Sequence, residues 1–148
     1  MPINADAVGK SYPPSSYAVG REKIREYAAA VGETNPLHHD LDAARAAGHP
    51  DLVAPPMFAA VYSRSAMIHP LLDPEVGIDF GRMVHGAQEF TWDRLVVAGD
   101  EIATTATVLS IEERGGLGFF AIETHSADAQ GARVCRGLWT HVVRGEQR

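Results

Sequence analysis

The spacing of hydrophobic residues changes about halfway along the chain. Between residues 21 and 31, apolar residues recur three or four positions apart, at Ile24, Tyr27, Ala28 and Val31. This spacing predicts an amphipathic helix, which Gly32 is suited to end. After residue 80 apolar and polar residues alternate instead. The period of two predicts four strands, at about 83–93, 101–111, 117–127 and 132–144.

The predicted strands are separated by residues that favour turns. These are Gly99-Asp100, Gly115-Gly116 and the segment 128–131. Several of the strands are longer than the five or six residues that are usual. Long antiparallel strands twist and curl, so we expect a curved sheet.

A second predicted helix, at about 56–68, has almost no polar face. It opens with Pro55-Pro56, and His69-Pro70 is expected to end it. A helix that is apolar nearly all round is normally buried. We therefore expect an α+β fold in which the antiparallel sheet wraps around this helix, as a single domain over residues 1–148. A short strand near 17–19 and a short helix over 41–47, capped by Asp40, complete the prediction.

Composition excludes several classes of function. The 148 residues carry a formal net charge of −6 and no basic run, which argues against a nucleic-acid surface. A single cysteine, Cys135, leaves no internal disulfide and no cysteine-rich metal site, and we expect no bound metal. No apolar run approaches the ~20 residues of a membrane span. The first residues lack the pattern of a signal peptide, so we expect a cytoplasmic protein.

The candidate chemistry lies between the first two predicted helices. Glu33 and His38 flank a bend that Asn35 and Pro36 are expected to shape. A carboxylate and an imidazole can together hold one water molecule and move its protons near neutral pH, without a metal. The neighbouring pair His39-Asp40 is an alternative, although Asp40 is better explained as a helix cap.

These residues also form a longer pattern. It runs from Tyr27 through Gly32-Glu33-Thr34-Asn35-Pro36-Leu37-His38 to Ala44. The pattern resembles the signature of the MaoC-like (R)-specific enoyl-thioester hydratases and dehydratases, which have the hot-dog fold. The segments Val53-Ala54-Pro55-Pro56-Met57-Phe58 and Val97-Ala98-Gly99-Asp100 resemble the actinobacterial small dehydratase subunits of fatty-acid elongation.

The resemblance implies reversible hydration of a trans-2-enoyl thioester to the (R)-3-hydroxyacyl thioester, with Glu33 and His38 as the catalytic residues. It implies a substrate carried on coenzyme A or acyl carrier protein, with no other cofactor. It also implies a homodimer, or a heterodimer with a related hot-dog subunit.

The chain departs from the family pattern at two positions. Glu33 replaces the usual aspartate, and Pro56 replaces a glycine whose N–H holds the thioester oxygen. Because proline has no N–H, the Met57 amide is the expected donor.

Other side chains have a functional and a structural interpretation. Phe58, Tyr62 and His85 are predicted to line an acyl pocket, although apolar residues on a buried helix are usually core. Arg64 or Arg82 is a candidate phosphate ligand. Cys135 is interpreted as a small buried hydrophobic residue.

Three other functions remain open from the sequence. The first is a non-catalytic subunit that binds the acyl chain within a heterodimeric dehydratase. The second is a hot-dog thioesterase, ranked lower because residues 56–68 contain no Asp or Glu. The third, an acyl-binding regulator, has no distinguishing sequence feature.

Overall fold

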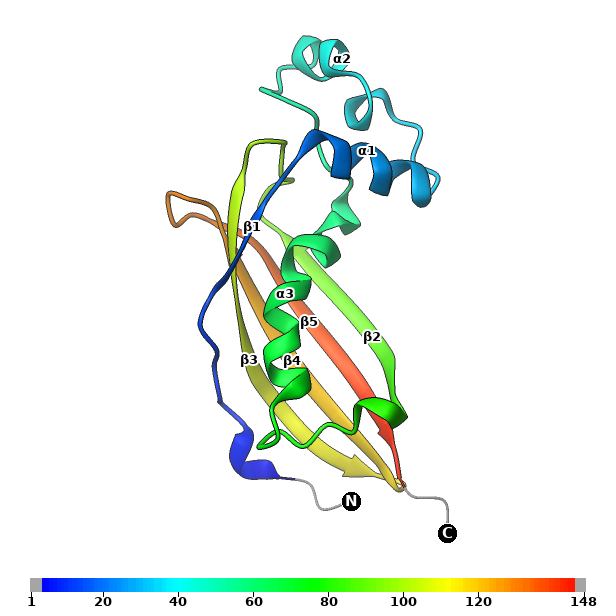
Figure 1. Ribbon diagram of the computed structural model, residues 1–148, viewed down its shortest axis with the longest axis vertical. Coiled ribbons are helices and arrows are strands. Elements are labelled where there is room, and N and C mark those ends of the chain that lie inside the picture. The colour runs from blue at the N-terminus through cyan, green and yellow to red at the C-terminus, as the bar shows by residue number, and fades with distance from the viewer. Residues whose placement is uncertain (1–3, 146–148) are drawn as a thin grey trace.

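A computed structural model describes residues 4–145 of the chain. Five antiparallel strands form one curved sheet in the order β1-β3-β4-β5-β2, and helix α3 lies against its inner face (Figure 1). This confirms the predicted sheet and central helix. The strands are β1 (Ser15–Ala18), β2 (Met83–Trp92), β3 (Glu101–Arg114), β4 (Leu117–Ala127) and β5 (Arg133–Arg144).

The predicted strands β2 to β5 agree with the structure except at the end of β3. This strand continues to Arg114, where it pairs with Leu117 at the start of β4. Gly115 and Gly116 connect the two strands with φ angles of 60° and 76°. A residue other than glycine rarely adopts such angles, so these two glycines form the whole turn and the strand runs up to them.

The helical segments before α3 agree with the prediction in position. Helix α1 (Arg21–Ala30) buries Ile24 and Ala28, but Val31 lies beyond its end with 54% of its surface exposed. A 3-10 turn, η2 (Pro36–His38), leads to α2 (Leu41–Ala46). The Asp40 carboxylate accepts hydrogen bonds from the first amides of α2, which confirms its role as a cap. Two further 3-10 turns are η1 (Ala5–Ala7) and η4 (Phe80–Arg82).

The central helix begins and ends differently from the prediction. Its first turn is a 3-10 turn, η3 (Pro56–Phe58), and α3 then runs from Ala59 to Leu72. The prediction that His69-Pro70 ends the helix is wrong. Pro70 lies in the last turn, where it removes one main-chain hydrogen bond and only two residues follow it, so the helix tolerates it.

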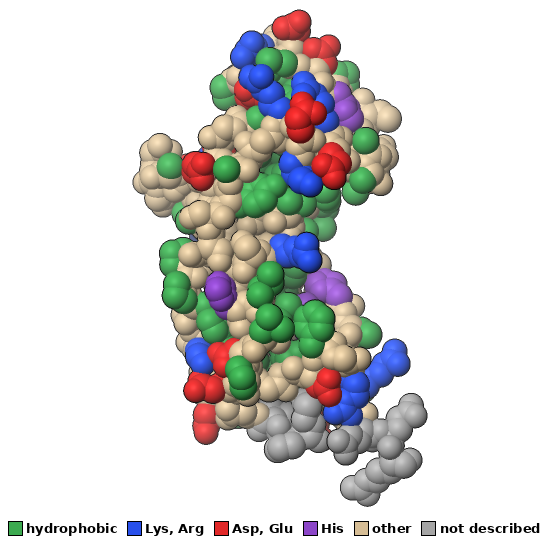
Figure 2. Space-filling view, in the orientation of Figure 1, with side chains coloured by type: hydrophobic (Ala, Val, Ile, Leu, Met, Phe, Trp, Pro, Cys, Tyr) green, Lys and Arg blue, Asp and Glu red, His purple; other side chains and the backbone are tan. Residues whose placement is uncertain are grey.

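Helix α3 is buried on one side only. Tyr62, Ala66 and Met67 face inward and are almost completely covered, whereas Ile68 and Leu72 are 46% and 64% exposed. The helix is therefore buried by the sheet, as predicted, but within the single chain it is covered on one side only. The reason is that the sheet wraps around one side of the helix, and hydrophobic side chains are visible on the open side of the molecule (Figure 2).

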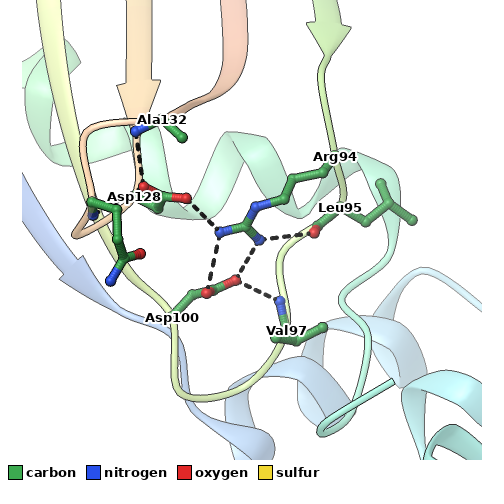
Figure 3. Close-up of polar contacts among 7 residues, drawn as sticks. Arg94, Leu95, Val97, Asp100, Asp128 and Ala132 are labelled. Carbon is green, nitrogen blue, oxygen red and sulfur yellow. Dashed lines mark hydrogen bonds and ion pairs between the residues drawn. The ribbon is translucent and has the colours of Figure 1, made fainter. Parts of the chain in front are cut away.

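One ion-pair network joins the loops at an end of the sheet (Figure 3). Arg94, in the β2–β3 connection, donates to Asp100 at 2.8 and 3.3 Å and to Asp128 at 3.2 Å. Asp100 also accepts the Val97 N–H at 2.9 Å, and Asp128 accepts the Ala132 N–H at 2.9 Å. The network fixes the β2–β3 connection, on which the candidate site depends.

Candidate active site

The bend at residues 33–38 is built by local hydrogen bonds. The Asn35 side chain accepts the Leu37 N–H at 3.1 Å, and the Asn35 carbonyl accepts the His38 N–H at 3.1 Å. Pro36 occupies the first position of η2, where no N–H is needed. Asn35 and Pro36 therefore set the direction of the main chain at His38.

His38 is held by a second segment of the chain. Its side chain is buried, with a relative exposure of 6%, and its Nδ1 lies 2.6 Å from the Val53 carbonyl oxygen. A carbonyl only accepts, so Nδ1 carries a proton and Nε2 is the acceptor of the neutral ring. In the described part of the chain, the buried side-chain nitrogens without a hydrogen-bond partner belong to His141, and none belongs to His38. His38 Nε2 therefore reaches solvent and can take a proton.

Val53 is positioned by the β2–β3 connection. It forms an isolated antiparallel bridge with Val97. Hydrogen bonds on either side, from the Ala54 N–H to the Val96 carbonyl and from the Ala98 N–H to the Leu52 carbonyl, are both 2.9 Å long. Because Arg94 and Asp100 hold this connection, they also fix the orientation of the His38 ring through Val53. Sequence reasoning did not find Arg94, since Asp128 is distant in the chain and no motif marks the pairing with Asp100 in the same connection.

Glu33 lies in an open cleft of about 340 Å³ at the start of the central helix. The residues that line the cleft are Tyr27, Val31, Glu33, Pro55, Pro56 and Met57. Burial, and secondarily the charge of Glu33, raise the pKa of Tyr27 above its ordinary value. The Glu33 carbonyl accepts a hydrogen bond from His39 Nε2 at 2.7 Å, which leaves His39 a structural role at this bend.

The Met57 amide belongs to the first turn of η3. The Phe58 N–H donates to the Pro55 carbonyl at 2.9 Å, whereas no acceptor for the Met57 N–H is found among residues 4–145. Amides of a first helical turn are typically free and favour negative charge. Trp92, at the end of β2, donates from Nε1 to the Pro56 carbonyl at 2.9 Å and so fixes this turn.

The structure brings Glu33 and Met57 to one cleft but does not place His38 among its lining residues. His38 lies on the adjoining segment, because its Nδ1 is bonded to Val53. Its chain neighbour Leu37 and its acceptor residue Val53 line a second cavity of about 560 Å³. Over the described residues, no group of three or more His, Cys, Asp and Glu side chains is arranged to hold a metal ion.

Phe58 and Tyr62 are located in the packed core, which differs from the expected lining of an acyl pocket. Phe58 has no exposed surface and contacts the rings of Tyr17, Tyr27 and Tyr62. Tyr62 is 2% exposed, and burial raises its pKa. Both residues belong to a core cluster that also includes Ile24 of α1 and Ile102 of β3, and neither lines any of the cavities described here. Cys135, which is 2% exposed, is a buried residue as predicted.

His85 is exposed at the edge strand β2 and does not line the Glu33 cleft. Its ring packs edge-on against Trp139 and His141, with centroids 6.0 and 5.2 Å apart. Those two residues line a separate cavity of about 320 Å³ beside α3. Sequence reasoning did not single out His141, although strand alternation puts it on the same face as Trp139.

The two candidate phosphate ligands differ in their surroundings. Arg82 is paired with Asp79 at 2.7 Å. Arg64 is exposed on α3, where it lines both the His141 cavity and a larger cavity of about 670 Å³ beside α1. Neither arginine lines the Glu33 cleft.

Comparison with known proteins gives the family. Residues 6–136 match the family described as FAS1-like, dehydratase domain region. A UPF0336 protein of Leifsonia xyli is 49% identical over 148 residues, which cover 99% of each chain. No helix in the described part of the chain is long and apolar enough to cross a membrane.

Two solved structures have the same fold and recognisable sequence identity. A chain of the truncated HadBC (3R-hydroxyacyl-ACP dehydratase) complex of Mycobacterium tuberculosis superposes with a TM-score of 0.84 at 26% identity, covering 95% of this chain and 99% of that one. A MaoC-like dehydratase gives 0.81 at 31% identity, with 94% of this chain spanning 42% of that protein. These likenesses confirm the hot-dog fold. The chain therefore belongs to the FAS1-like dehydratase-region family, together with the UPF0336 proteins, and its structural relatives are MaoC-like dehydratases.

Proposed function

We propose that this protein catalyses the reversible hydration of a trans-2-enoyl thioester to the (R)-3-hydroxyacyl thioester. The observation that carries the proposal is that Glu33 and Met57 line one open cleft next to the segment that orients His38. The likeness to a chain of the HadBC (3R-hydroxyacyl-ACP dehydratase) complex supports it. The substrate is carried on coenzyme A or acyl carrier protein, and no further cofactor takes part.

The reaction requires three functions from the protein. Water adds to C3 of the enoyl group while a proton reaches C2, and negative charge develops on the thioester oxygen. Glu33 and His38 hold the water between the carboxylate and Nε2 and exchange its protons, as a pair with one shared proton network. The Met57 N–H and the start of the central helix stabilise the oxygen.

The proposal includes a second hot-dog subunit and a cytoplasmic location. The structural relative HadBC is a complex, which supports a partner subunit. The partner is either a second copy of this chain or a related subunit. It would face the open side of the sheet and helix, where hydrophobic side chains are exposed.

A second candidate function is that of an acyl-binding subunit whose partner performs the chemistry. The absence of an N–H at Pro56 and the position of His38 outside the lining of the Glu33 cleft favour it. A thioesterase ranks third, because α3 carries no Asp or Glu.

Hydration of crotonyl-CoA by the purified full-length chain tests the proposal, with the loss of enoyl-thioester absorbance as the measurement. We expect turnover by the wild-type protein and a loss of about 10²–10⁴-fold in kcat for both His38→Ala and Glu33→Gln. Matched controls are His125→Ala and Glu113→Gln, which alter surface side chains of β4 and β3 and should keep the wild-type rate.

Three results would replace the proposal. Turnover that persists in His38→Ala excludes the Glu33–His38 mechanism. No turnover alone, but turnover once a second hot-dog subunit is added and unaffected by His38→Ala, identifies the acyl-binding subunit. Release of free thiol without loss of the double bond identifies the thioesterase.

A further inference from the structure

Glu33 lies in a bend that belongs to no strand of the sheet. The bend follows α1, and α1 and α2 lie together at one end of the molecule (Figure 1). Glu33 is exposed, and over residues 4–145 no hydrogen bond or ion pair to its carboxylate is found. The direction of this side chain therefore depends on how firmly its main chain is held.

The N–H of Glu33 is fixed by the end of α1. It donates to the Ala28 carbonyl at 2.8 Å, and the Gly32 N–H donates to the Ala29 carbonyl at 3.2 Å. Gly32 has a φ angle of 75°, so these bonds form the Schellman motif that ends many helices. The motif does not reach the Glu33 carbonyl, for which no main-chain donor is found in the described chain.

The Glu33 carbonyl is held by a side chain instead. His39 Nε2 lies 2.7 Å from the carbonyl oxygen. A carbonyl only accepts, so Nε2 carries a proton in the neutral ring, as it does in the charged ring. The hydrogen bond therefore persists in both protonation states of His39.

His39 is itself anchored at both of its peptide groups. Its N–H donates to the Pro36 carbonyl at 3.1 Å, and its carbonyl accepts Arg25 Nε at 3.1 Å. Arg25 lies on α1, where it pairs with Glu22 one turn earlier. Through Arg25 and His39, helix α1 therefore holds the second peptide group of Glu33 as well as the first.

His39 takes no part in the cleft itself. Its ring is half-buried and lines neither the Glu33 cleft nor any other cavity described above. Its chain neighbour Asp40 is engaged as the cap of α2. His39 therefore differs from His38, whose accessible Nε2 is suited to proton transfer.

We propose that His39 is a positioning residue for Glu33. By holding the Glu33 carbonyl, it fixes the direction in which the side chain leaves the main chain and hence the distance of the carboxylate from the water that His38 shares. A glutamate needs this support more than an aspartate, because its side chain has one more rotatable bond. The inference rests on the proposed hydratase function, in which Glu33 takes part.

Three substitutions of His39 separate the hydrogen bond from the bulk of the ring. The side-chain amide of glutamine can place an N–H near the position of Nε2, whereas asparagine is too short and leucine has no donor. We expect His39→Gln to keep a kcat for crotonyl-CoA close to that of the wild type. His39→Asn and His39→Leu should lose about 10–100-fold in kcat, the cost of a catalytic group misplaced by about 1 Å. KM should change little, because His39 does not line the cleft.

A double substitution shows whether His39 acts through Glu33. In the Glu33→Gln background, His39→Leu should cause no further loss of kcat, since the group that it positions is already inactive. A residue that only stabilised the fold would add its loss to that of Glu33→Gln. His125→Leu, on the surface of β4, is the control and should keep the wild-type rate.

NMR relaxation gives a measurement that needs no catalysis. The Thr34 amide belongs to the same peptide group as the Glu33 carbonyl, so its order parameter reports on that group. We expect about 0.85, the value of a rigid backbone, in the wild type and His39→Gln. We expect a value below about 0.6 in His39→Leu, with urea unfolding as the check that this variant remains folded.

Three kinetic results would each overturn the proposal. They are a wild-type kcat in His39→Leu, equal losses in His39→Gln and His39→Leu, and additive losses in the double substitution. If the wild-type protein hydrates no thioester, the proposed function fails and the order parameter alone decides. A Thr34 amide that stays rigid in His39→Leu overturns the positioning role, and one that loosens only when the donor is absent supports it.

Discussion

Two buried histidines of this chain differ in whether their ring nitrogens have hydrogen-bond partners. His38 satisfies Nδ1 with the Val53 carbonyl and keeps Nε2 accessible, which is the arrangement that a proton-transfer residue needs. His141 is buried among apolar groups with neither nitrogen paired. The first arrangement costs little stability, whereas the second lowers it, since an unpaired buried polar group carries its full desolvation cost.

The unpaired His141 predicts a specific dependence of stability on pH. Its pKa is about 4 in the folded protein and 6.5 without the protein environment. The unfolded chain therefore binds a proton more readily, so the contribution of His141 is complete above pH 6.5 and is lost as the pH falls to 4. The loss is about 3 kcal/mol, at 1.36 kcal/mol per pKa unit.

Urea unfolding of wild type and His141→Phe between pH 7 and pH 4 measures this effect. Carboxylates contribute equally to both proteins, so the difference between their free energies of unfolding isolates His141. We expect the variant to be as stable as the wild type or more stable at pH 7, and its advantage to grow as the pH falls. Parallel curves would show that His141 does not titrate as the structure indicates.

At the residue scale, local interactions were predictable from the sequence and distant ones were not. Asp40 was recognised as a cap because its partners follow it directly in the chain. The acceptor of His38 is Val53, and the partners of Arg94 are Asp100 and Asp128. No spacing rule connects His38 with Val53 or Arg94 with Asp128, because these contacts depend on how separate loops meet after the sheet has formed.

At the scale of elements, the spacing of apolar residues predicted whether a segment is a helix or a strand. It predicted less well which surfaces cover that segment. Alternation identified strands β2 to β5 and the helical repeat identified α1. The apolar pattern of α3 predicted a buried helix, but the pattern does not say whether the covering surface belongs to the same chain. Helix α3 is covered by the sheet on one side, and Ile68 and Leu72 remain exposed on the other.

One glycine in the sheet has a packing role that is testable. Gly137 of β5 lies between Thr124 of β4 and Phe90 of β2. A Cβ at this position would lie 2.4 Å from the Thr124 hydroxyl and 2.9 Å from Phe90 and Trp139 ring atoms. We expect Gly137→Ala to destabilise the protein by about 1–3 kcal/mol, as overpacked core substitutions do.

Thermal and urea unfolding of Gly137→Ala measure this loss. The control is Gly20→Ala, at a position where an added Cβ meets no atom within 4 Å. The control should change stability much less. If Gly137→Ala has the same free energy of unfolding as the wild type, the prediction is wrong. The side chains of Thr124, Phe90 and Trp139 would then move aside without loss of stability.

At the scale of the whole molecule, the sheet has one long unprotected edge. Strand β2 pairs with β5 on one side, and its other side has no neighbouring strand in the described chain. Most of its residues are exposed, including Val84 at 43%. A long exposed edge strand is a template for pairing with another chain, and the one irregularity in β2, between His85 and Ala87, leaves residues 87–92 in regular register.

We therefore expect the protein to associate through β2, as a homodimer or with a related subunit. Sedimentation of the pure chain at micromolar concentration should show a dimer. The double substitution Val84→Lys with Ala87→Lys should shift it to a monomer, because lysines repel across such an edge. Leu109→Lys, at an equally exposed residue of the inner strand β3, is the control and should remain dimeric. A monomeric wild-type protein would contradict the homodimer and leave the related subunit as the partner.

The hydrogen bond from Trp92 to the Pro56 carbonyl connects these scales. Trp92 is the last residue of the edge strand, and Pro56 carries the turn that presents the Met57 amide. A second chain paired along β2 would contact Trp92 and, through this hydrogen bond, would shift the turn that carries the proposed donor to the thioester oxygen. Solitary and assembled forms of the protein should differ in turnover even when every side chain of the cleft is unchanged.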